Sequence, residues 1–268
     1  MKKRITISLL ALVALATTVS IISSTKTKEL STTEKYKVIK VDGRIVIQKT
    51  KEDMKKGDVY LSGMALSFET PQSRAAVISA LSGRFVLSAT EKGQTKILPA
   101  ANNISSRAGA LINMIDLQNH FSGKYLVIGE MKLELGKEAF PMDEENFFYL
   151  TYNHNDEQIR KKLSSDGEYL ILNKEEIFMI DGKSIPVEEK EMVLYYRSEG
   201  QSKKISTFTP VFADKAELKD EISIILEEYA DKDNKVKVKE VTAYLNEFYG
   251  HPEKDNLAEW LKEEFSIE

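Results

Sequence analysis

Residues 36–48 read YKVIKVDGRIVIQ, two runs rich in β-branched residues on either side of the pair Asp42-Gly43. This pair favours a tight turn with positive φ, so we expect a hairpin that joins strands at Tyr36–Val41 and Arg44–Gln48. Similar runs follow at residues 59–61, 65–68, 75–79 and 84–88, with turn residues between them. Six short strands of this kind predict a small antiparallel barrel or sandwich over residues 36–100.

The turns of this segment also carry a resemblance to a known family. The ordered pieces are Val41-Asp42-Gly43-Arg44, Lys56-Gly57-Asp58-Val59, Ser62-Gly63-Met64, Arg74-Ala75-Ala76-Val77 and Ser82-Gly83-Arg84-Phe85. With them, residues 41–87 resemble the FecR domain, a β-rich module found outside the cytoplasm. Signalling members of that family place a regulatory segment before their membrane helix. Here Met1–Arg4 alone precede the apolar run, so we do not expect an anti-sigma role.

The first residues of the chain have the pattern of a signal peptide. Lys2, Lys3 and Arg4 form a positive cluster, residues 5–22 are mainly apolar, and residues 23–28 are polar. A charged region followed by an apolar one is typical of export signals. We therefore expect an exported protein, periplasmic or secreted.

Small residues at the end of the apolar run predict where the signal is cleaved. Thr18 with Ser20 is the better pair for a peptidase, and Ile22 with Ser24 is the second. We assign residues 1–24 to the signal peptide and residues 25–35 to a flexible leader. An uncleaved anchor remains open, because about 18 apolar residues approach the length that spans a bilayer.

Composition limits the chemistry and the partners. The chain has no cysteine, which excludes disulfides, thiolate metal sites, cysteine nucleophiles and a lipid-anchored cysteine after the signal. Its 38 basic and 42 acidic residues give a net charge of −4, and the basic residues are dispersed. Both features disfavour nucleic-acid binding.

The remainder of the chain predicts a second β-rich module and a helical unit. We expect a connector at residues 101–123, in which 108–121 is either a short helix or a strand, and then the second module at residues 124–210. Its expected strands are at residues 124–128, 131–135, 147–152, 169–172, 177–180, 192–196 and 204–208.

Helical periodicity begins after Pro210. Asp214 with Glu217 predicts a capping box, a second helix ends at Gly250, and Asn256 opens a third. We expect these three helices, at residues 211–268, to pack on the preceding sheet. The predicted fold class is mainly β (α+β), with two small antiparallel β modules followed by a short C-terminal helical unit.

No catalytic, metal or cofactor motif is evident. His120, His154 and His251 stand outside any metal-binding spacing, so each is interpreted as a surface or turn histidine. Asp143 and Glu145 are the carboxylates that a hydrolase could use, but close neighbours in a turn do not converge across a cleft. Residues 231–236 imitate a calcium loop, yet Lys235 and Val236 stand at a ligand position and at the turn glycine.

An aromatic cluster at residues 147–152 could contact a carbohydrate or a peptide. Because side chains alternate along a strand, Phe147 and Tyr149 should share one face and Phe148 the other, so at least part of the cluster packs in the core. We interpret it as packing.

These observations favour an exported, non-enzymatic β-rich protein that binds an envelope protein or a cell-surface component. We expect no nucleic acid, no cofactor, and contact with a membrane only through an uncleaved N-terminal segment. The alternative is an exported hydrolase that uses Asp143, Glu145, or His154 with a serine.

Overall fold

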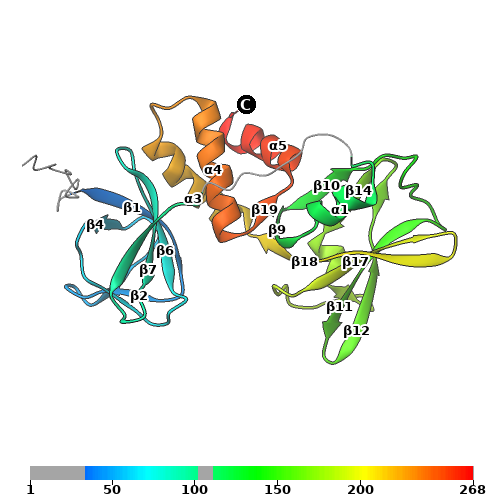
Figure 1. Cartoon of the computed structure of the whole chain (residues 1–268), viewed down its shortest axis with the longest axis horizontal. Coiled ribbons are helices and arrows are strands. Elements are labelled where there is room, and N and C mark those ends of the chain that lie inside the picture. Colours follow the sequence, from blue (N-terminus) through cyan, green and yellow to red (C-terminus); the bar gives the residue numbers. More distant parts are fainter. Residues whose placement is uncertain (1–33, 102–110, 268) are drawn as a thin grey trace, which may run out of the picture.

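The computed structural model describes residues 34–101 and 111–267 of the chain (Figure 1). The predicted fold class is confirmed, since the protein is mainly β, with several antiparallel sheets and a C-terminal helical unit. The predicted signal peptide, with Ser20 and Ser24, lies outside the described residues. Within the described ranges, no helix is both long and apolar enough to cross a membrane.

The first module consists of two antiparallel sheets that enclose a small core. One sheet has the strand order β4-β1-β6-β7-β8, and the other has the order β3-β2-β5. Buried side chains such as Val38, Ile45, Tyr60 and Leu87 fill the space between them. The strands are β1 (Lys35–Asp42), β2 (Ile45–Ile47), β3 (Glu52–Asp53), β4 (Val59–Leu61), β5 (Leu66–Phe68), β6 (Arg74–Ser79), β7 (Gly83–Ala89) and β8 (Thr95–Pro99).

The expected hairpin at Asp42-Gly43 is wrong. Gly43 has the predicted positive φ, +74°, but β1 pairs with β4 and β6 whereas β2 pairs with β3 and β5. The turn is therefore a corner at which the chain leaves one sheet for the other. A Cβ atom on Gly43 would also lie 2.6 Å from Oγ of Ser73, so both φ and space require glycine here.

The second module is a six-stranded sheet, ordered β12-β11-β17-β18-β9-β19, that packs on the smaller sheet β10-β14-β13. Its first half contains α1 (Met114–His120), β9 (Gly123–Ile128), β10 (Glu130–Glu134), β11 (Phe147–His154), β12 (Glu157–Lys162) and β13 (Ser165–Asp166). Its second half contains β14 (Tyr169–Asn173), α2 (Lys174–Ile177), β15 (Met179–Ile180), β16 (Lys183–Ser184), β17 (Met192–Ser198) and β18 (Gln201–Ala213).

Three details of this module differ from the sequence predictions. The strand expected at residues 177–180 is the end of α2 followed by the short β15, and β9 runs parallel to both β18 and β19. The boundary expected at residue 210 lies inside β18. Pro210 is tolerated there because β18 pairs with β17 only as far as Phe208, so its other side is an edge beyond that point.

The helical unit contains α3 (Lys215–Glu228), α4 (Asn234–Phe248), the two-residue strand β19 (His251–Pro252) and α5 (Lys254–Phe265). The predicted start of α3 is confirmed, because the Asp214 carboxylate accepts hydrogen bonds from the backbone N–H groups of Ala216 and Glu217. The third helix begins earlier than expected. Glu253 caps it, while Asn256 bonds to both backbone groups of Lys132 in β10 and so ties α5 to the second module.

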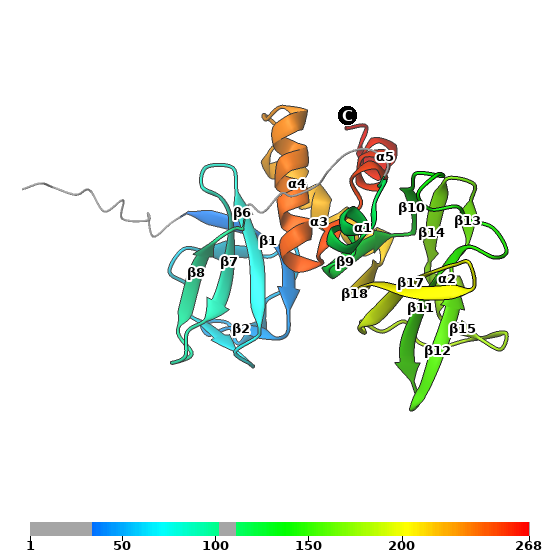
Figure 2. The ribbon, with the colours of Figure 1, turned by 45° about the vertical axis from the view of Figure 1, so that its right-hand side comes forward.

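The helices lie between the two β modules (Figures 1 and 2). One continuous apolar core joins Ile39, Ile78 and Val86 of the first module to α3 and α4, and reaches Leu126 of β9 in the second. The expected packing of the helices on a sheet is therefore found, and it involves both modules. The helical unit fixes the two modules to each other.

Buried ion pairs accompany this apolar contact. The side chain of Arg84, which has no exposed area, lies 2.6 Å from the Glu240 carboxylate, also pairs with Glu247, and sits over the ring of Tyr244. In a second group, the buried Glu221 carboxylate accepts hydrogen bonds from the hydroxyls of Tyr244 and Tyr249. These polar contacts can form in only one position of α4 on the first sheet.

We expect Arg84→Ala to lower the free energy of unfolding by about 3 kcal/mol, because it leaves the carboxylates of Glu240 and Glu247 in the interface without a counterion. Urea denaturation measures the change. Arg44→Ala is the control, since it removes an exposed pair with Asp53 and should cost less than about 1 kcal/mol. Equal losses in the two variants would contradict the role assigned to Arg84.

Candidate functional site

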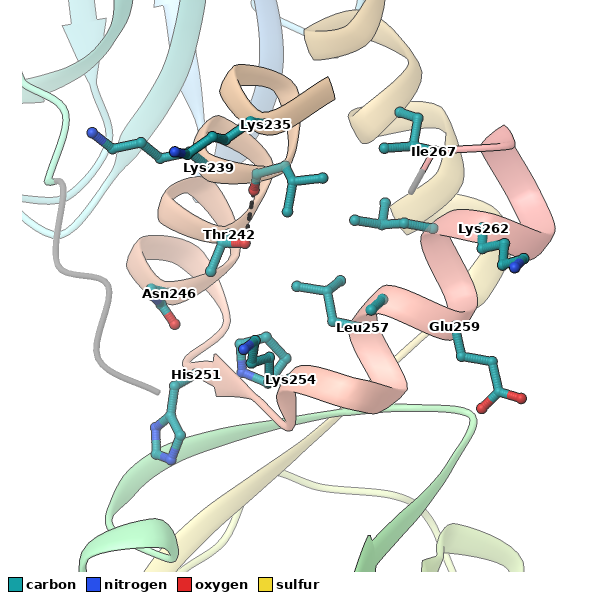
Figure 3. A pocket seen from close by; sticks show the side chains of 14 residues that line it. Lys235, Lys239, Thr242, Asn246, His251, Lys254, Leu257, Glu259, Lys262 and Ile267 are labelled. Carbon is teal, nitrogen blue, oxygen red and sulfur yellow. Dashed lines mark hydrogen bonds between the residues drawn. The ribbon is translucent and has the colours of Figure 1, made fainter. Parts of the chain in front are cut away.

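A groove of about 660 Å³ lies between α4 and α5 (Figure 3). Its surface is largely apolar and includes Val238 of α4, Leu257 and Leu261 of α5, and Ile267 after α5. The hydroxyl of Thr242 donates a hydrogen bond to the backbone oxygen of Val238, so the donor of this polar side chain is already paired within α4. We call this feature the helical groove. Its size is typical of sites for small molecules, which are roughly 300–1,000 Å³.

Basic side chains surround the helical groove. Lys235 and Lys239 extend from α4, Lys254 lies near His251 at one end, and Lys262 points away from the groove on the side of α5 (Figure 3). Lys235, Lys239 and Lys254 form no ion pair with the described residues. Glu259 is the acidic residue in the lining, so the rim is electropositive.

The chain between α4 and α5 sets the position of the groove. Gly250 has φ +103°, and a Cβ atom there would lie 2.3 Å from the backbone oxygen of Lys124. The close approach allows His251 and Pro252 to pair with β9 as β19. Because β19 is anchored on the second module, α5 starts at the sheet and remains separated from α4 at this end.

A second hollow of about 680 Å³ adjoins the helical groove and shares His251 and Lys254 with it. We call it the histidine pocket, because His120 of α1 also lines it. The Nε2 atom of His251 lies 2.7 Å from the backbone oxygen of His120, although 131 positions separate them. The sequence did not predict this contact between His120 and His251, whose side chains are both partly buried. His154 lies at the turn between β11 and β12, as expected.

Burial keeps the side chains of His120 and Tyr125 neutral. Burial, with a smaller effect from the neighbouring His251, lowers the pKa of His120 to about 4. Burial also raises the pKa of Tyr125 well above its usual value, with a smaller effect from Glu253. A hydrogen bond of 2.6 Å joins Nε2 of His120 to the Tyr125 hydroxyl. At neutral pH this bond joins two uncharged groups, the partly buried His120 and the fully buried Tyr125.

The polar side chains of the pocket have structural partners in place of catalytic ones. The Ser122 hydroxyl donates to the backbone oxygen of Asn119, and Glu253 caps α5 through Asn256. A serine hydrolase needs a bond between its nucleophile and its base. Among the described residues, Ser122 forms no such bond with His120 or His251.

The other candidates from the sequence also serve local structure. Asp143 accepts hydrogen bonds from the backbone of Glu145 and from the backbone and side chain of Asn146, which lowers the pKa of its carboxyl. Asp233, in the calcium-like segment, caps α4. Over residues 34–101 and 111–267 there is no group of three or more potential ligands that could hold a metal ion.

The helical groove was missed in the sequence, because the three helices at residues 211–268 were expected only to pack on the preceding sheet. One signal was available, since Lys235 and Lys239 are four positions apart and lie on one face of α4. The alternation predicted for the aromatic cluster is confirmed. Phe148 is buried, whereas Phe147 and Tyr149 lie on the opposite face of the sheet.

Comparisons with known proteins add little. No family model and no curated protein matches the chain. Among solved structures it is similar to immunoglobulin domains 1–4 of Sidekick-1, with 13% identity and a TM-score of 0.18. It is also similar to the N-terminal four immunoglobulin domains of Dscam1 isoform 6.44, with 9% identity and a TM-score of 0.19. Each alignment covers 66% of this chain and 44% of the other, so the chain spans less than half of either structure. Likeness at this level carries no argument about function.

We expect His120 to make stability depend on pH. Its pKa in the folded protein, about 4, is below the value of about 6.5 in an unfolded chain, so only the unfolded state gains a proton between these values. The contribution is complete above pH 6.5 and is lost as the pH falls to 4, by about 3 kcal/mol.

Urea denaturation between pH 7.5 and 4.5 tests this. His120→Gln should flatten the decline relative to the unchanged protein, while His154→Gln, at an exposed hairpin turn, should leave it unchanged. If His120→Gln keeps the full decline, the buried imidazole is not its source.

Proposed function

We propose that the protein is an exported, non-enzymatic binding protein and that the helical groove holds its ligand. The ligand is an acidic amphiphile, an anionic lipid or a free long-chain acid from the cell envelope. The apolar groove between α4 and α5 carries this proposal, together with Lys235, Lys239 and Lys254 on its rim, which form no ion pair with the described residues. An apolar chain would cover Val238, Leu257 and Leu261, and the acid group would lie beside Lys239 or Lys254.

The sequence supports export independently of the groove. Lys2, Lys3 and Arg4 before the apolar residues 5–22 are typical of a signal, and the resemblance of residues 41–87 to the FecR domain agrees with a place outside the cytoplasm. A ligand of this kind is available in the envelope.

The packing around the groove supports binding without a large entropic cost. Arg84 holds α4 on the first module, and Asn256 holds α5 on β10. Because both walls are fixed before a ligand arrives, little order must be gained on binding. A hydrolase has less support, since the groups of the histidine pocket are occupied by structural bonds.

Titration with a fluorescent long-chain fatty acid tests the site. Ala258→Trp, which fills the groove from an exposed position, and the double change Lys239→Glu with Lys254→Glu should each weaken binding about tenfold, equivalent to about 1.4 kcal/mol. Lys49→Glu with Lys92→Glu makes the same charge change on the first module and should have no effect.

The methyl ester of the same acid should bind more weakly than the acid. Vesicles with and without phosphatidylglycerol distinguish an intact anionic lipid from the free acid. Unchanged binding by Ala258→Trp would contradict the placement of the ligand in the groove.

We expect the mature protein to begin at Ile21 or Thr25, after cleavage following Ser20 or Ser24. Mass spectrometry of the N-terminus, after fractionation of the producing cells, measures this. Intact Met1 in the membrane fraction would show that the N-terminal segment is not cleaved and anchors the protein. Intact Met1 in the cytoplasm would contradict export.

A further inference from the structure

The outer face of the six-stranded sheet carries a row of tyrosines and lysines. Residues paired across neighbouring antiparallel strands point to the same face. Tyr149 of β11 pairs with Lys162 of β12 and with Tyr195 of β17, and Tyr195 pairs in turn with Lys204 of β18. The row Lys162-Tyr149-Tyr195-Lys204 therefore crosses four strands, over a distance of about 14 Å at the usual spacing.

The rows on either side add two further cations. Arg160 pairs with Thr151, which pairs with Val193, and Arg197 pairs with Phe147. No aspartate or glutamate occupies these three rows, which we call the tyrosine–lysine face.

The basic side chains of this face form no direct ion pairs among the described residues, although Lys162 lies close enough to Asp143 to donate a hydrogen bond to its backbone oxygen and to contribute to the lowered pKa of its carboxyl. Arg160, Lys162, Arg197 and Lys204 are exposed, and none forms an ion pair with another described residue. Lys162 instead lies 4.4 Å from the centre of the Phe147 ring. In a chain of net charge −4, this concentration of positive charge is local and selects an anionic partner.

The tyrosine rings determine which kind of anion fits. The rings of Tyr149 and Tyr195 stack on each other at 5.0 Å with planes 8° apart, and Phe147 lies 6.2 Å from Tyr149 on the same face. Single-stranded nucleic acids require exposed ring faces on which bases can stack. Here one face of each tyrosine ring is covered by the other ring, which leaves fewer ring faces for bases. Neither tyrosine hydroxyl bonds to another described residue, so both are available to a ligand rich in hydroxyl groups.

We propose that the tyrosine–lysine face binds an acidic polysaccharide. Its acid groups pair with the lysines and arginines, and its hydroxyls bond to Tyr149 and Tyr195. This site shares no residue with the helical groove and does not depend on the ligand proposed for it.

Binding of polygalacturonate to the whole protein, measured by calorimetry at low and at physiological salt, tests the proposal. Lys204→Glu should weaken binding about tenfold. Lys203→Glu is the matched control, because Lys203 is the adjacent exposed residue of β18 but pairs with the buried Tyr196 and so belongs to the other face. It should change the affinity less than twofold.

Tyr149→Phe with Tyr195→Phe retains the stacked rings and removes the hydroxyls, and it should also weaken binding. Neutral dextran should not bind, and an oligothymidylate should bind more weakly than polygalacturonate. Absence of polygalacturonate binding, equal losses in Lys204→Glu and Lys203→Glu, or tighter binding of the oligonucleotide would each overturn the proposal. The two sites are separate if Ala258→Trp loses fatty-acid binding and still binds polygalacturonate.

Discussion

The buried pairing of Arg84 with Glu240 and Glu247 fixes the arrangement on which the helical groove depends. Apolar side chains tolerate small shifts between a helix and a sheet, but a buried charge that loses its partner costs several kcal/mol. Arg84 lies on β7 of the first module, and both carboxylates lie on α4. The helix is therefore held in one register on the sheet. Glu221 reinforces this register, because burial and its charge raise the pKa of Tyr244 and keep that hydroxyl a donor.

From α4, the constraint passes along the chain to the second module. Gly250 allows the chain to leave α4 close to the backbone of Lys124, and β19 then joins the edge of the six-stranded sheet at β9. The next helix starts immediately, and Asn256 ties it to β10. The helical groove is the space left between a helix fixed on the first module and a helix fixed on the second. Its shape depends on long-range packing and not on any local motif.

This dependence explains how much the sequence could predict. Alternation along a strand separated Phe148 from Phe147 and Tyr149, and Asp214 marked the start of α3, because both signals act within a few residues. The partners of β1 and β2 could not be predicted, since Asp42-Gly43 permits a corner as well as a hairpin. The meeting of His120 with His251, and the groove formed by Leu257 and Leu261, arise from contacts between segments far apart in sequence.

The net charge of the chain also differs from the local charge of the tyrosine–lysine face. A net charge of −4 disfavours a polyanion approaching from a distance, and on that ground the sequence argued against nucleic acid. Screening, however, limits interactions between exposed charges to about 8 Å at physiological salt. Within that range an anion beside Tyr149 and Tyr195 meets Lys204 and Arg160, while the acidic excess elsewhere on the chain is screened. The proposed preference for a polysaccharide over a nucleic acid therefore rests on the two tyrosines, whose rings stack on each other, and not on the overall charge.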